Sequence, residues 1–96
     1  MATGSTSRAG SWKNVGTSVS LPWTATSDGY IYADVNPNSS AIAYYYINVD
    51  SIVNWANIVA RDGTRTQQFF PVVEGKTYSL GSSSNVKSVN LRFYSL

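Results

Sequence analysis

FFPVVEGKTYSLGSSSNVKSVNLRFYSL, residues 69–96, is the stretch that decides the fold. It holds two or three short runs of strand-forming residues, divided by the turn Glu74-Gly75 and by a looser turn over 81–85. The last run continues to Leu96, and an apolar run at a chain end is normally built into a sheet, because a loose one would fray. The stretch therefore predicts a β-sandwich whose final strand is central or lies at a subunit contact.

The last run has the two-residue period of a strand. Val89, Leu91 and Phe93 fall on one face, whereas Arg92 and Tyr94 fall on the other. One face can therefore enter a core while the other stays available for a partner.

Strand signals also recur upstream, at the spacing of roughly eight to twelve residues that is typical of sandwiches and barrels. The run 41–49 is apolar on both faces, so it must be covered on both sides. Asp62-Gly63 is the strongest hairpin signal in the chain. Residues 36–40 are expected to form a loop, and 50–55 at most one helical turn. The upstream strands are expected at 15–21, 30–35, 41–49, 56–61 and 64–70.

Length and composition favour one small all-β domain that gains stability by assembly. The chain has 96 residues, 43% hydrophobic and only 12% charged, with no Cys. A core of this size is modest, and without disulfides oligomerisation is the obvious supplement. Residues 1–11 are expected to be a flexible leader, either a linker from a larger protein or cloning sequence. Residues 12–96 are expected to form the domain, an antiparallel, jelly-roll-like β-sandwich assembled as a homotrimer.

The charge pattern argues against nucleic acid and membrane partners. The net charge is +2, and the seven Lys and Arg residues are scattered rather than clustered. No apolar run approaches the length of a membrane span, and the start of the chain lacks a signal-peptide pattern. Because the chain has no Cys and therefore no disulfide, it is expected to fold in a reducing cytoplasm.

The sequence also argues against catalysis and bound cofactors. There is no His and no Cys, which removes the commonest general base and most transition-metal ligands. Of the five carboxylates, three directly precede Gly and are expected in turns, and the spacing of Asp34 and Asp50 supports no acid–base pair. The segment 34–38 resembles the start of a calcium loop, but Ser39 and Tyr45 stand where Gly and Glu are required. We expect no enzyme activity, no metal and no cofactor.

Tyrosine is abundant, and its placement suggests an interface. In strands where Ile31, Ala33 and Val35 or Leu91 and Phe93 fill the core, the alternating tyrosines would point outward. Tyrosine is common at protein interfaces because its ring buries a large area while its hydroxyl still finds a partner. The alternative is that the faces are reversed and the tyrosines form the core. The expected interface residues are Tyr30, Tyr32, Tyr44, Tyr46, Arg92 and Tyr94.

One tryptophan stands in a cluster suited to sugar binding. Asn54, Trp55 and Asn57, followed by Arg61, combine a ring that can stack on a sugar with planar polar groups that can hold hydroxyls. The alternative is that Trp55 caps one end of the core, since large aromatic residues are mostly buried.

Three short motifs together resemble a known family. They are Thr24 to Gly29 followed by Tyr30-Ile31-Tyr32, then Pro71, Val72, Gly75 and Tyr78, and a closing strand from Leu91 to Tyr94. Over residues 12–96 the chain resembles the C-terminal head domain of bacteriophage tail fibres and receptor-binding proteins. Such heads are β-sandwiches related in shape to the C1q and tumour-necrosis-factor jelly rolls.

The resemblance implies a trimeric adhesin at the tip of a virion fibre. Three copies would pack around an axis with the tyrosine face inward, and the leader would join the rest of the fibre. Loops would bind a host cell-surface polysaccharide or protein receptor, and several weak sites together would give tight attachment. No family motif marks the binding residues. Two other hypotheses stay open: a monomeric carbohydrate-binding module of an enzyme, and a structural trimerisation cap that binds nothing.

Overall fold

The computed structural model describes residues 16–96, which contain eight β-strands and no helix. The expectations for the leader 1–11, for Trp12 and for Val15 lie outside these residues. The strands are β1 (Thr17–Ser18), β2 (Trp23–Thr24), β3 (Gly29–Pro37), β4 (Ala43–Val49), β5 (Ile52–Ala60), β6 (Thr66–Val72), β7 (Thr77–Ser84) and β8 (Val86–Ser95).

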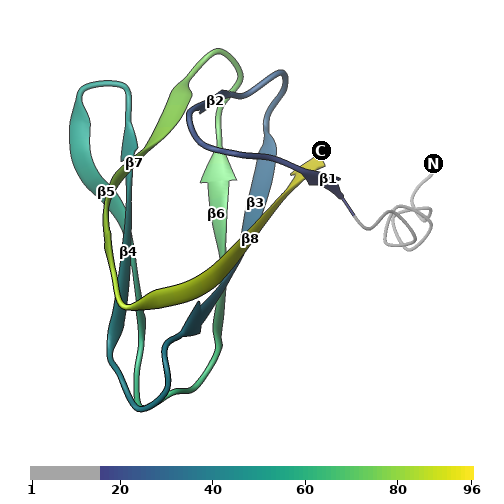
Figure 1. Cartoon of the computed structure of the whole chain (residues 1–96). Helices are drawn as coiled ribbons and strands as arrows, with labels where there is room; N and C mark the ends of the chain where they lie inside the picture. Colours follow the sequence, from purple (N-terminus) through teal and green to yellow (C-terminus); the bar gives the residue numbers. More distant parts are fainter. Residues whose placement is uncertain (1–15) are drawn as a thin grey trace.

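The strands form two antiparallel sheets that pack as a β-sandwich (Figure 1), which confirms the all-β prediction. Sheet A has the order β1-β8-β3-β6, and sheet B has the order β2-β7-β4-β5. The final strand β8 lies inside sheet A, between β1 and β3.

The core lies between the sheets, and in β3 and β4 it is built by strict alternation. Along β3, Ile31, Ala33 and Val35 are buried while the residues between them are partly exposed; β4 shows the same pattern. The core contains no buried polar or charged residue among residues 16–96. Its members are Ala25, Ile31, Ala33, Val35, Ala43, Tyr45, Ile47, Val49, Ala56, Ile58, Ala60, Phe70, Val72, Tyr78, Leu91 and Phe93.

Most connections cross from one sheet to the other, which corrects one turn prediction. Asp62 and Gly63 do form a turn with positive φ angles of 54° and 73°, closed by the Thr64 N–H on the Arg61 carbonyl. However, β5 pairs with β4 in sheet B, and β6 pairs with β3 in sheet A. Asp62-Gly63 therefore joins the two sheets and is not the turn of a hairpin.

One hairpin is present among residues 16–96, and its turn lies in the segment 50–55, where the sequence predicts no strand. Asp50 and Ser51 form a two-residue turn between β4 and β5, with Val49 opposite Ile52 and a φ of 49° at Asp50. The expectation of a helical turn over 50–55 is wrong, because β5 begins at Ile52.

Three further boundaries differ from the expectations. The strand expected over 15–21 is reduced to the two residues of β1 within the described part. β3 extends through Asn36 to Pro37, next to a bulge in its pairing with β8, so the expected loop is shorter. The looser turn expected over 81–85 is a tight one, because β7 continues to Ser84 and Asn85 alone, at a φ of 58°, leads into β8.

Two of the three motifs that carry the family resemblance, those that begin at Thr24 and Pro71, contact each other at one end of the sandwich. Trp23 and Thr24 pair with Tyr78 and Thr77. The N–H of Gly75 donates to the Ala25 carbonyl, at 2.9 Å. These contacts join the first motif to the second, beside the β6–β7 turn.

Candidate binding surfaces

Four aromatic residues lie together on the outer face of sheet A, and we call them the aromatic patch: Tyr30, Tyr32, Phe69 and Tyr94. Tyr30 stands opposite Tyr94, and Tyr32 stands opposite Phe69 across the central strand β3. The Phe69 ring centroid lies 5.0 Å from that of Tyr32 and 6.3 Å from that of Tyr94. Tyr30 is 43% exposed and Phe69 is 51% exposed. Rings gathered in this way on a surface mark a contact site more often than isolated apolar residues do.

The six expected interface residues do not share one face. Arg92 pairs with Tyr32 and lies beside the aromatic patch on sheet A. Tyr44 and Tyr46 belong to β4 of sheet B, where they alternate with core residues. Their ring centroids are 6.0 Å apart. They therefore lie on the opposite side of the sandwich, and a single flat tyrosine face does not exist. Phe69 was not among the predicted interface residues. It pairs with Tyr32 across β3 and β6, so it lies on the same outer face and is exposed.

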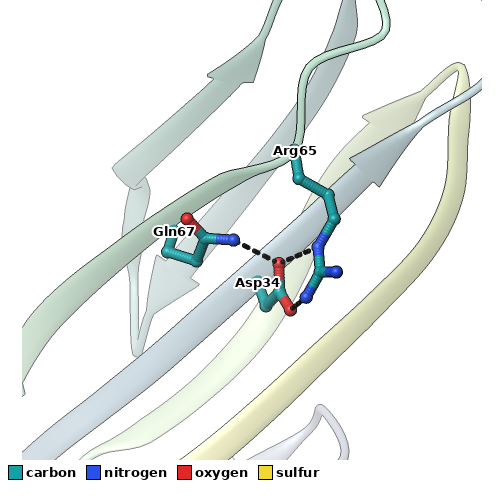
Figure 2. Close-up of polar contacts among 3 residues, drawn as sticks. All are labelled: Asp34, Arg65 and Gln67. Carbon is teal, nitrogen blue, oxygen red and sulfur yellow. Dashed lines mark hydrogen bonds and ion pairs between the residues drawn. The ribbon is translucent and has the colours of Figure 1, made fainter.

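A polar network of Asp34, Arg65 and Gln67 is drawn in Figure 2. It lies beside the aromatic patch, because the pair Asp34–Gln67 is two positions along the strands from the pair Tyr32–Phe69. Arg65 forms a two-pronged ion pair with Asp34, in which its Nε donates to Oδ1 at 3.1 Å and its Nη2 donates to Oδ2. Gln67 donates from Nε2 to the same Oδ1, at 3.1 Å. The hydrogen bond from Arg65 lowers the pKa of the Asp34 carboxyl below its ordinary value; partial burial opposes this, and the Gln67 hydrogen bond adds to the lowering. The network fastens the loop after β5 to the central strand of sheet A.

The expected sugar cluster is dispersed along β5. Asn54 is exposed at a φ of 54°, and its N–H donates to the Asn48 side chain at 2.8 Å. Asn57 stands opposite Tyr46 and is exposed. Arg61 follows the far end of β5, about 20 Å from Trp55 if each strand residue rises by roughly 3.3 Å. Of the four residues, Trp55 lines the hollow described next, and the other three do not line it.

Trp55 is half-buried at the edge of the core, and it also lines a hollow. Its ring lies 5.8 Å from Phe70 and 5.4 Å from Tyr78, centroid to centroid, so its orientation is fixed by contacts with both sheets. The hollow has a volume of about 330 Å³, at the lower end of the range for small-molecule sites. It is lined by Val49, Asp50, Ile52, Trp55, Pro71, Val73, Lys76 and Tyr78.

The residues that line the hollow lie at the end of the sandwich that carries the β4–β5 and β6–β7 turns. Figure 1 shows these two turns at the same end. Two apolar residues of the wall of the hollow, Ile52 and Val73, are 57% and 53% exposed. Its charged groups are Asp50 and Lys76, whose Oδ2 and Nζ are 3.6 Å apart. The apolar wall with one charged pair suits a ligand that has both an apolar face and a polar edge.

Asp50 is held in place by the neighbouring strand. Its N–H donates to the Thr77 carbonyl at 2.8 Å, and its Oδ1 accepts from the Thr77 N–H at 3.0 Å. Its Oδ2 therefore keeps a fixed direction beside the hollow, whereas Lys76 remains half exposed.

Residues 16–96 contain no group of three or more Asp or Glu side chains placed to hold a metal ion, and Asp34 of the calcium-like segment is engaged by Arg65. Nor do they contain a helix of the length and hydropathy needed to cross a membrane. Comparison with models of protein families, with curated proteins and with solved structures finds no match for this chain.

Proposed function

We propose that the chain is a non-catalytic adhesion domain that assembles with two copies of itself and recognises a molecule on a host cell surface, as the head of a phage tail fibre does. The observation that carries the proposal is the aromatic patch on sheet A. Two of its four rings are about half exposed, so burying the patch against another copy would remove apolar surface from water.

The strand orders support the family resemblance. In the orders 1-8-3-6 and 2-7-4-5, each sheet takes alternate pieces of the chain and β4–β5 is the one hairpin among residues 16–96. This winding has the form of a jelly roll, the shape that the resemblance implies. A jelly-roll head at the tip of a virion fibre would present its turns to a host receptor while its sheets stay fixed.

Assembly would use sheet A and leave sheet B free. Arg92 and the Asp34–Arg65 ion pair surround the aromatic patch and supply polar groups for the rim of a contact. The interface of three copies around an axis is heterologous, so different parts of this face would meet in each contact.

Light scattering tests the assembly directly. The wild-type chain should give three times the single-chain mass of 10.4 kDa. Phe69→Glu and Tyr30→Glu should give the single-chain mass, because a carboxylate in the contact would lose its water and face like charges near the axis. Tyr46→Glu on sheet B is the matched control and should remain trimeric. A wild-type monomer would overturn the proposal.

The second candidate is a monomeric carbohydrate-binding module, and the hollow beside Trp55 favours it because that site needs no second subunit. Light scattering and a binding assay of the same sample separate the two functions. A monomer that binds polysaccharide supports the module, whereas a trimer that attaches to cells supports the fibre head. A trimer that binds no cell and no glycan would leave only a structural cap.

A further inference from the structure

We propose that the hollow beside Trp55 binds one sugar ring, with Trp55 as the stacking surface and Asp50 and Lys76 as hydrogen-bonding partners for two neighbouring hydroxyls. The proposal rests on the glycan-binding form of the proposed function, and it places that binding at one end of the sandwich.

Trp55 provides a flat surface of fixed orientation. Contacts with Phe70 and Tyr78 hold its ring from inside the sandwich, and a further part of the ring faces the hollow. A pyranose ring carries several C–H groups on one face, and their slight positive charge is attracted by the negative face of an aromatic ring. The pairing needs no movement of the tryptophan, so little side-chain entropy is lost on binding.

The charges at the rim indicate a neutral ligand with hydroxyl groups. Asp50 and Lys76 cancel each other, so the rim attracts neither an anion nor a cation strongly. At 3.6 Å their contact is long for a charged hydrogen bond, and both side chains retain hydrogen-bonding capacity. Adjacent hydroxyls of a sugar can donate to the carboxylate and accept from the ammonium. A purely apolar group would cover both charges without replacing their bonds to water, which is unfavourable.

The size and wall of the hollow narrow the ligand further. About 330 Å³ suits a single ring and not an oligosaccharide bound along its length. Because Ile52, Pro71 and Val73 make much of the wall apolar, a sugar that carries a methyl group should bind better than one that carries only hydroxyls. We therefore expect 6-deoxyhexoses and N-acetylhexosamines to bind better than glucose.

Nuclear magnetic resonance of the tryptophan indole groups tests the site in the full chain. The Trp55 signal, assigned with Trp55→Phe, should shift on titration with the methyl glycoside of a 6-deoxyhexose or of an N-acetylhexosamine, with millimolar affinity. The Trp23 signal should move less, because Trp23 packs on Tyr78 and Phe93 and does not line the hollow.

Two substitutions test the hydrogen-bonding pair. Asp50→Asn keeps an acceptor for the Thr77 N–H, and Lys76→Gln changes a half-exposed side chain, so both variants should fold. Each should weaken sugar binding by roughly tenfold, the effect of losing one charged hydrogen bond of about 1.4 kcal/mol. Lys87→Gln on the exposed part of β8 is the control and should bind as the wild type does.

The outcomes separate this inference from the assembly proposal. If no sugar shifts the Trp55 signal at tens of millimolar, the inference is wrong whatever the oligomeric state. If short apolar peptides shift it and sugars do not, the hollow binds a protein receptor and the inference is also wrong. A monomeric chain that binds sugar at Trp55 would overturn the trimer and leave the sugar site standing.

Discussion

The phenol oxygen of Tyr78 accepts a hydrogen bond from the backbone N–H of Val73, at 3.0 Å. Tyr78 belongs to β7 of sheet B, whereas Val73 directly follows β6 of sheet A. The buried ring therefore spans the sandwich, and its hydroxyl fixes the turn that forms one wall of the hollow.

Removing this hydroxyl should weaken the fold measurably. Tyr78→Phe keeps the ring but leaves the Val73 N–H without its acceptor, so we expect a loss of about 1 kcal/mol in the free energy of unfolding. Urea denaturation measures the loss. Tyr46→Phe, on the outer face of sheet B, is the control and should change stability by less than half as much; equal effects would contradict this role of Tyr78.

Gly29 is required by close packing and not by its φ angle. A Cβ at this position would lie 2.2 Å from the Tyr94 carbonyl oxygen and 2.9 Å from the Phe93 ring. Gly29→Ala should therefore push β3 and β8 apart and cost about 1–3 kcal/mol, as overpacking does. Thermal unfolding of Gly75→Asn supplies the comparison, because a Cβ at Gly75 meets no atom within 4 Å and Asn tolerates positive φ. A Gly29→Ala variant as stable as wild type would refute the contact.

Asn85 makes the turn between β7 and β8 by two separate means. It adopts a φ of 58°, and its side-chain Nδ2 donates to the Ile42 carbonyl at 3.1 Å. Glycine in the variant Asn85→Gly adopts the positive φ easily but cannot make the side-chain hydrogen bond. Alanine in Asn85→Ala cannot make the hydrogen bond either, and it is also strained at this φ. We expect the free energy of unfolding, measured by urea denaturation, to fall by roughly 0.5–1 kcal/mol in Asn85→Gly and by about 1 kcal/mol more in Asn85→Ala. Equal stabilities of the two variants would show that the backbone conformation is not strained.

The Asp34 network should make stability depend on pH in acid. The folded-state pKa of Asp34 lies below its unfolded value, so the unfolded chain binds the proton more readily. Its stabilising effect is fully present above the unfolded pKa of about 3.9 and is lost as the pH falls through the folded pKa. Unfolding free energies of wild type and Asp34→Asn, measured from neutral pH downward, should converge in this window. A constant difference across the window would exclude the linkage, and Asp62→Asn is the control.

Much of the fold could be predicted from the sequence because alternation reports burial directly. The buried residues of β3 lie on the face that its two-residue period indicates. The run 41–49 is apolar on both faces, so its period does not choose between them, and the expectation that both are covered is not met, because in β4 the face of Tyr44 and Tyr46 stays partly exposed. The two-residue period of a strand does not show to which sheet the strand belongs. The sequence therefore predicts Tyr30 and Tyr44 on one interface, whereas they lie on opposite sides of the sandwich.

Local signals also failed where tertiary pairing decided the structure. The serines 82–84 have low strand propensity, yet they form strand because β4 supplies partners for them. Asp62-Gly63 specifies a turn, but which strands pair on either side of it depends on the rest of the chain.

The hollow beside Trp55 could not be predicted from the sequence, because it depends on an irregularity in the pairing of β4 with β5. Asn54 with its positive φ lies in an irregular stretch of the β4–β5 pairing, and alternation is broken there. Trp55 therefore reaches the core edge and the hollow, while Asn57 returns to the outer face. Positive φ at Asn is common enough to suggest such a break but cannot locate it.

The short first strands have a mechanical consequence. β1 holds β8 through two residue pairs and β2 holds β7 through two, whereas β3 and β8 share nine. A force applied to the backbone ahead of Gly16 would detach β1 and β2 first. The segment that they occupy would then extend before the two sheets separate. Single-molecule stretching should then record a small early extension ahead of the main rupture. A single rupture without it would show that β1 and β2 bear load together with the rest of the sandwich.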